Sequence, residues 1–156
     1  MSRKILVAFD DSENAMRAVE YVAGLLSKDC RITLFSVVQD TASICDMQSP
    51  ELTPYFKSQQ DSLCVLEEKK KQILSAAQVK AKAILTSGGF PEDQIRLKSE
   101  PKKKGIARDI VAEAQTGYDL VVLGRRGLAG IREFFMGSVS QKVLSLAQEL
   151  PILIIS

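Results

Sequence analysis

Four short apolar runs and one weaker predicted strand, the third in order, alternate with four segments of helical periodicity, and this order limits the fold more than any other feature of the chain. The predicted strands cover residues 4–9, 31–38, 94–99, 119–123 and 151–155. Several of these runs are apolar without interruption, which is typical of strands that are buried on both faces. Strands that alternate with helices indicate a parallel sheet with helices on both sides. The sequence therefore predicts an α/β fold with a single open, doubly wound, five-stranded parallel sheet.

The segments between the runs carry helix signals. Ser12 can cap a first helix, and a strongly charged helix is predicted over 58–87, where two glycines end it. A third helix is predicted around 106–114, and Ser138 opens a fourth. Residues 40–57 are polar and contain two prolines, so we expect a long loop or lid there.

The composition excludes several classes of function. The chain has no His, which removes Ser-His-Asp and Cys-His catalysis and every His-based metal site. Its 21 Lys and Arg residues against 19 Asp and Glu leave a net charge of +2. This balance does not predict nucleic acid or a membrane surface as a partner. A chain of this length suits one hydrophobic core, so we expect residues 1–156 to form a single domain.

The lack of a recognisable targeting signal and the pattern of cysteines both favour a cytoplasmic protein. Only five apolar residues separate Lys4 from Asp10, which is too short for a signal-peptide core. No apolar run approaches the ~18 residues of a membrane span. Cys30, Cys45 and Cys64 have neither metal-ligand nor redox-motif spacing. We expect free thiols, buried or half-buried, with regulatory oxidation as the alternative.

Polar residues and glycines gather where the first and fourth predicted strands end. Asp10 and Asp11 follow the first strand, and Gly124 ends the fourth. Ligands of open parallel sheets bind beyond the carboxyl ends of such strands, where the strand order reverses. Gly137 and Ser138 then begin a helix, whose free N–H groups favour phosphate. The other polar side chains of this stretch are Arg125, Arg126, Arg132 and Ser140.

These residues suggest a phosphate cradle built mainly from backbone amides, with Ser138 and Ser140 as hydroxyl donors. The stretch is neither GxxxxGK[ST] nor GxGxxG after the first strand, which argues against efficient phosphoryl transfer. On spacing alone, the glycines could equally serve only to turn a long loop, with Ser138 as a helix cap.

The spacing Gly-x2-Gly-x9-Gly-Ser, filled by Gly124, Gly127, Gly137 and Ser138, resembles the nucleotide signature of the ATP-binding branch of the universal stress protein family. The similarity covers nearly the whole chain except residues 40–57. It implies a Rossmann-like sheet of order 3-2-1-4-5 and ATP or another adenine nucleotide as ligand. We expect Mg²⁺ only because it commonly accompanies polyphosphates. It also implies a homodimer formed through the apolar last strand, which lies at the sheet edge.

The resemblance further implies a role for each matching residue. Asp10 would lie at the ribose or hold a divalent ion, and Val37 would pair with adenine through its backbone. Ala8 would form a pocket wall. Arg125 replaces a residue that is commonly small and hydroxylated, so its side chain would either reach phosphate or crowd the entrance. The strand-exit turn and the phosphate-facing helix start would be formed by Gly124, Gly127, Gly137, Ser138, Val139 and Ser140.

The favoured function is a nucleotide-dependent regulatory or stress-response module without catalytic residues. The alternative is a slow Mg-dependent ATPase in which Asp10 or Asp11 orients water. A third possibility is an interaction protein with an empty pocket. A phosphorylated receiver domain would need an Asp after the third strand and a Lys after the last, and neither is present. A flavin carrier shares the fold, but the glycine signature suits an adenine nucleotide better.

Overall fold

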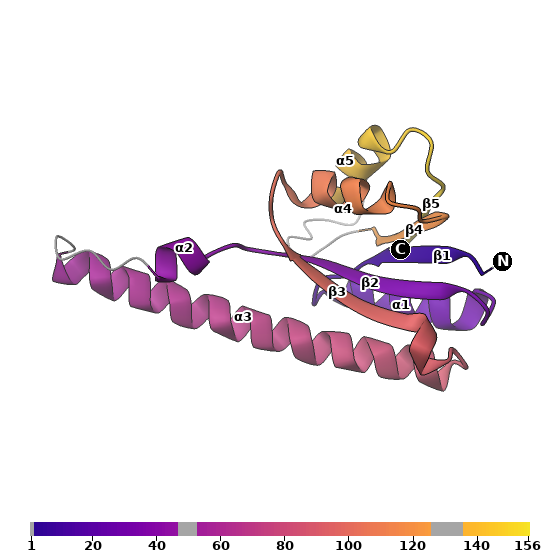
Figure 1. Cartoon of the computed structure of the whole chain (residues 1–156), viewed down its shortest axis with the longest axis horizontal. Coiled ribbons are helices and arrows are strands. Elements are labelled where there is room, and N and C mark those ends of the chain that lie inside the picture. The colour runs from indigo at the N-terminus through magenta and orange to yellow at the C-terminus, as the bar shows by residue number, and fades with distance from the viewer. Residues whose placement is uncertain (1, 47–52, 126–135) are drawn as a thin grey trace.

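The computed structural model describes residues 2–46, 53–125 and 136–156. Five parallel strands form one sheet of order β3-β2-β1-β4-β5 (Figure 1). This confirms the predicted open α/β sheet and its strand order. The strands are β1 (Lys4–Ala8), β2 (Arg31–Val38), β3 (Ile95–Pro101), β4 (Leu120–Gly124) and β5 (Ile152–Ile155).

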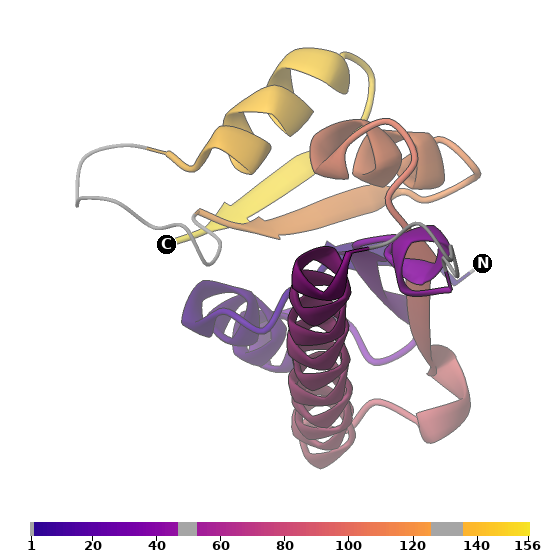
Figure 2. The same ribbon diagram turned by 90° about the vertical axis from the view of Figure 1, so that its left-hand side faces the viewer.

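Helices cover both faces of the sheet, as predicted (Figure 2). The helices α1 (Glu13–Leu25) and α3 (Pro54–Ser87) lie on one face, and α4 (Ile106–Ala114) and α5 (Ser138–Leu146) lie on the other. Two short elements complete the described chain. They are α2 (Ala42–Cys45) and a 3₁₀ turn at Glu92–Gln94.

Alternating side chains of the strands form two separate cores. In β1, Ile5 and Val7 pack in the cluster beneath α1 and α3, whereas Leu6 packs in the cluster beneath α4 and α5. Successive strand residues point to opposite faces, so an uninterrupted apolar run supplies both cores at once. All three side chains are at most 2% exposed. The unbroken runs in the sequence therefore reflect a two-sided sheet.

Local signals mark the start of α1 and both ends of α3. The Ser12 hydroxyl accepts the backbone N–H of Ala15 at 3.1 Å, which caps α1 as predicted. Gly89 follows α3 with φ of 102°, a left-handed conformation that glycine adopts without strain. The start of α3 differs from the prediction, because Thr53 caps the helix and Pro54 is its first residue, four residues before the expected start.

A disulfide corrects the predictions for the cysteines and for the 40–57 segment. Cys45 of α2 is bonded to Cys64 of α3, so only Cys30 keeps a free thiol. Burial raises the pKa of the Cys30 thiol. The described part of the segment is also not simply loop, because it contains α2 and the first turn of α3.

The helix α3 extends well beyond the sheet (Figure 1). Its C-terminal half packs on the sheet through Ala81 and Leu85, which are fully buried. Its N-terminal half exposes large side chains, including Tyr55 at 68% and Phe56 at 59%. Among the described residues, no helix combines the length and the apolar character needed to cross a membrane.

Candidate functional site

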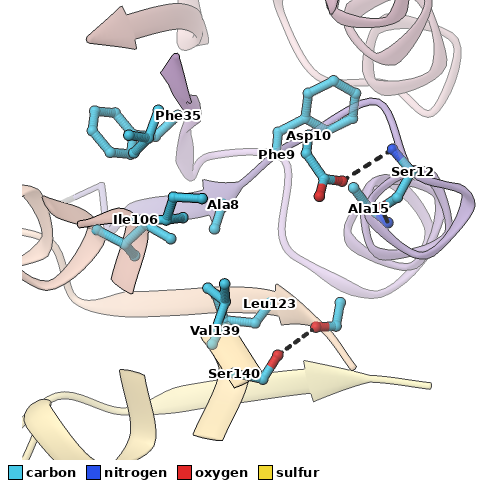
Figure 3. A pocket seen from close by; sticks show the side chains of 13 residues that line it. Ala8, Phe9, Asp10, Ser12, Ala15, Phe35, Ile106, Leu123, Val139 and Ser140 are labelled. Atoms are coloured by element: carbon cyan, nitrogen blue, oxygen red, sulfur yellow. Dashed lines mark hydrogen bonds between the residues drawn. The ribbon is translucent and has the colours of Figure 1, made fainter. Parts of the chain in front are cut away.

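A cavity lies at the carboxyl ends of the central strands, where the strand order reverses between β1 and β4 (Figure 3). This is the position at which open α/β sheets bind ligands. Its walls come from the ends of β1, β2 and β4 and from the starts of α1, α4 and α5. They are formed by Ala8, Phe9, Asp10, Ser12, Ala15, Phe35, Val37, Ile106, Ile110, Leu123, Gly124, Val139 and Ser140.

The structure brings most of the predicted site residues to this cavity. Those that line it are Ala8, Asp10, Val37, Gly124, Val139 and Ser140. Arg125, Gly137 and Ser138 lie beside the cavity without lining it. Gly127 falls outside the described residues.

The exit of β1 is held by a short polar turn. A side-chain oxygen of Asp10 accepts the backbone N–H of Ser12 at 3.0 Å (Figure 3). The second carboxylate oxygen has no protein partner in the described part of the chain. Asp10 is the one carboxylate among the residues found to line the cavity. It can therefore accept hydrogen bonds from a hydroxylated ligand or bind a cation.

The end of β2 leaves peptide groups without a neighbouring strand. The Phe9 N–H donates to the Phe35 carbonyl at 2.8 Å, so the odd-numbered residues of β2 direct their peptide groups toward β1. Val38 directs its carbonyl the other way, because it accepts from the N–H of Lys102 at 2.7 Å. The N–H and C=O of Val37 therefore point past the end of β1, and no described main-chain group bonds to them there.

Gly124 is required by packing at the end of β4. A Cβ atom at this position would lie 3.0 Å from the carbonyl carbon and oxygen of Asn14, in the first turn of α1. This distance is shorter than nine in ten real Cβ contacts, so a side chain here would require the start of α1 to move by a few tenths of an ångström. The sequence suggests a role for Gly124 in approaching phosphate, which stays a prediction; the close neighbour that the structure shows is α1 of the same chain.

The start of α5 is tied to the end of β4 by three hydrogen bonds. The Ser140 hydroxyl faces the carbonyls of Gly124 and Arg125 at 2.9 and 3.2 Å, and the Gly137 N–H donates to the Arg125 carbonyl at 2.8 Å. The single hydroxyl hydrogen of Ser140 is therefore used within the protein. In this arrangement the hydroxyl positions the helix, and a hydrogen bond from Ser140 to phosphate stays a prediction.

The first amides of α5 remain available. Gly137 is the N-cap residue and has no side chain to bond them. The first three helical residues are Ser138, Val139 and Ser140, whose N–H groups have no intrahelical acceptor. Among the described residues no capping side chain reaches them. The predicted role of this helix start as an anion-binding end agrees with this geometry.

Seven lining residues were not identified as site residues from the sequence, namely Phe9, Ser12, Ala15, Phe35, Ile106, Ile110 and Leu123. Phe35, Leu123, Ile106 and Ile110 form apolar walls, and Ile106 is 42% exposed at the rim. Ile106 and Ile110 are four residues apart on one face of α4, a spacing that equally indicates an ordinary core-facing stripe. Only the position of α4 over the strand ends distinguishes the two roles.

The chain has relatives of matching length. A universal stress protein from Thermus aquaticus is 28% identical over 146 residues, which is 93% of each chain. The universal stress protein YxiE from Bacillus subtilis is 29% identical over 156 residues, 99% of each chain. One from Synechocystis is 32% identical over 145 residues, 90% of each chain.

Solved structures share the fold. The universal stress protein UspA from Lactobacillus plantarum superposes with a TM-score of 0.64 at 18% identity, covering 99% of this chain and 97% of that one. A universal stress protein solved in complex with cAMP superposes with a TM-score of 0.62 at 17% identity, covering 99% and 96%. The sequence also matches the family as a whole over residues 1–156. The chain therefore belongs to the universal stress protein family.

Proposed function

We propose that the protein binds an adenine nucleotide, with ATP as the preferred ligand, and acts as a nucleotide-dependent regulatory module. The observation that carries the proposal is the N–H and C=O of Val37 at the apolar end of the cavity, to which no main-chain group of the described residues is bonded. Adenine presents an acceptor at N1 beside a donor at its exocyclic amine. One residue that offers both a donor and an acceptor in the same plane is complementary to this edge.

The rest of the cavity suits the remaining parts of such a ligand. Side chains of Phe35, Ile106 and Val139 supply apolar walls for the base. Asp10 lies at the end of β1, between β2 and β4, where a ribose would lie when the base is at Val37. The uncapped start of α5 lies beyond β4, on the far side from Val37, and favours the phosphates. Two further observations support the class of ligand, namely the family membership and the cAMP complex of a structural relative.

The geometry favours binding over catalysis. Among the described residues, a single carboxylate lines the cavity and no group of three potential metal ligands is found. Mg²⁺ commonly binds through one or two carboxylates together with phosphate oxygens, so Asp10 suffices to hold it beside a polyphosphate. A slow ATPase would need Asp10 to orient water as well, although one of its oxygens already accepts the Ser12 N–H. Single-turnover hydrolysis that Asp10→Ala abolishes without loss of binding would favour the ATPase.

Binding is tested by isothermal titration with ATP, AMP and cAMP, and by mass spectrometry of any ligand released from the purified protein. A ligand at 100 times its Kd should stabilise the fold by about 2.7 kcal/mol. Gly137→Val should abolish binding without unfolding the domain, because φ of −59° and ψ of 152° suit a β-branched residue. Gly127→Val is expected to do the same. Gly24→Val is the matched control, since a side chain there meets open space.

The cytoplasmic location is a separate proposal that does not depend on the identity of the ligand. The Cys45–Cys64 disulfide counts against it, because protein disulfides are rare in a reducing cytosol. Mass spectrometry of alkylated protein, trapped in cells before lysis, would show whether the bond exists where the protein works.

A further inference from the structure

A buried polar bridge joins α3 to the end of β1 behind the proposed base site. The Ser36 hydroxyl donates to the Phe9 carbonyl at 2.7 Å and accepts from the side-chain amide of Gln78 at 3.1 Å. The same amide nitrogen donates to the Ser99 hydroxyl at 3.0 Å. Ser36 is 1% exposed and Gln78 is 8% exposed. Buried polar groups of this kind are costly unless fully bonded, so the bridge specifies one arrangement.

The bridge occupies the point where the β1–β2 ladder stops. In a parallel ladder that continued, the Phe9 carbonyl would accept the N–H of Val37. The Phe9 N–H does make the preceding ladder bond, to the Phe35 carbonyl, but the next bond is absent among the described residues. The Ser36 hydroxyl fills that place at the Phe9 carbonyl. Val37 thereby keeps its N–H for another acceptor.

We infer that Ser36, oriented by Gln78, is a positioning residue that ends the ladder and keeps the Val37 peptide groups open for the base. This inference rests on the proposed function. Gln78 brings a hydrogen to the Ser36 oxygen, so the hydroxyl hydrogen must point elsewhere, and the Phe9 carbonyl receives it. Without the hydroxyl, the buried Phe9 carbonyl lacks a partner and the Val37 N–H is the nearest replacement in the ladder.

The test compares Ser36→Ala with Ser99→Ala by titration with ATP and with ITP. Both variants remove one acceptor of Gln78, but only Ser36→Ala removes the bond to Phe9. Ser36→Ala should raise the Kd for ATP about tenfold, the order expected for one buried hydrogen bond. Ser99→Ala should leave it within about twofold. Ser36→Thr keeps the hydroxyl and should recover most of the affinity.

The ability to discriminate between bases distinguishes a positioning role of Ser36 from a general effect on the stability of the protein. Hypoxanthine reverses the donor and acceptor of the adenine edge, so the wild type should prefer ATP over ITP. In Ser36→Ala the Val37 N–H should bond to the Phe9 carbonyl instead, so the ratio of the affinities for ATP and ITP should fall toward one. If Ser36→Ala lowers only the Tm and keeps the ATP-to-ITP ratio, the inference is wrong while the proposed function stands. A wild type that binds no adenine nucleotide overturns both.

A second variant keeps the test usable if Ser36→Ala does not fold. Gln78→Met removes the donor that orients Ser36 but preserves the volume of the side chain. It should reduce the ATP-to-ITP preference in the same direction, by about threefold, because the hydroxyl is then free to rotate. An unchanged preference in Gln78→Met would contradict the role given to Gln78.

Discussion

At the scale of single residues, the packing of α1 against β4 favours glycine at position 124, in addition to any role of Gly124 at the ligand site. A Cβ atom there would lie 3.0 Å from the backbone of Asn14, so Gly124→Ala must push α1 away from β4. We expect the free energy of unfolding to fall by about 1–3 kcal/mol, as for other overpacked sites. Urea denaturation followed by circular dichroism measures this change.

Gly24 provides the matched control for that substitution. It lies in α1, exposed, with nothing within 4 Å of an added Cβ. Gly24→Ala should therefore stabilise the protein by about 0.5–1 kcal/mol, the difference in helix propensity. Equal effects of the two substitutions would show that Gly124 is not in close contact with α1.

Asp109 makes the segment before α4 sensitive to pH. Its carboxylate accepts the backbone N–H groups of Lys103 at 2.8 Å and Lys104 at 3.0 Å, which lowers the pKa of this carboxyl. A lowered folded-state pKa adds stability above the unfolded value of 3.8, and this stability is lost as the pH falls through the folded value. We expect Asp109→Asn to be less stable than the wild type at pH 7.

Thermal unfolding between pH 7 and pH 2.5 tests this expectation. The difference in Tm between wild type and Asp109→Asn should narrow as the pH falls below about 4 and the carboxylate becomes protonated. A difference that stays constant over the whole range would mean that the charge of Asp109 contributes nothing to stability.

The sequence predicted residue types at the site better than residue roles. Asp10, Val37 and Gly124 line the cavity as expected. The order of strands and glycines places Asp10 and Gly124 at strand ends, whereas Val37 was identified through the resemblance to the family. The role of Ser140 was missed, since a hydroxyl can bond a ligand or a nearby carbonyl and only coordinates decide which. Ser36 was missed for another reason, because its partners are 27 and 42 residues away.

At the scale of elements, the Cys45–Cys64 disulfide should control the order of α2 and the start of α3. The two cysteines are 19 residues apart. In the chain-entropy description, a ring of that size lowers the entropy of the unfolded chain and so stabilises the fold by about 3 kcal/mol. Reduction should therefore speed amide hydrogen exchange in α2 and the first turns of α3, while exchange in the sheet stays unchanged.

Hydrogen exchange with and without a dithiol, read by mass spectrometry, measures that effect. The double variant Cys45→Ser, Cys64→Ser should match the reduced wild type. Cys30→Ser removes the one free thiol and should behave as the oxidised wild type. Identical exchange in oxidised and reduced protein would show that the disulfide does not order this segment.

Element prediction succeeded where hydrophobic periodicity was strong. The strands β1, β2, β4 and β5 follow from apolar runs, and the helices α1, α4 and α5 follow from apolar stripes. The strand β3 is mainly polar and gave a weaker signal. The start of α3 was placed too late because its first turn, which includes Tyr55 and Phe56, is exposed and shows no apolar stripe, so the Thr53 cap is the main signal. The disulfide depends on the folded proximity of α2 and α3, which spacing does not encode.

At the scale of the whole molecule, β5 leaves one edge of the sheet unpaired by the described chain. Pro151 and Ile155 direct their carbonyls toward β4, so Ile152 and Ile154 direct their peptide groups outward. An open apolar edge favours pairing with another strand, and a twofold axis would pair two copies of β5. We therefore predict a homodimer with twice the 17.1 kDa mass of the chain.

Light scattering at micromolar concentration tests the assembly. Ile154→Pro removes an outward N–H without breaking a bond to β4, so it should convert the dimer to a monomer while the circular dichroism spectrum persists. A wild type with the mass of one chain would contradict the prediction. A dimeric Ile154→Pro would place the interface elsewhere.

The length of α3 turns small rotations into large displacements. From Gln78, which the sheet holds, to Pro54 at its start, the helix runs 24 residues, or about 36 Å. A tilt of about 5° around Gln78 moves the far end by about 3 Å. The helix can therefore work as a lever that pivots at Gln78, whose side chain is hydrogen-bonded to Ser36. A partner protein bound to Tyr55 and Phe56 would be displaced much farther than the residues of α3 that contact the sheet.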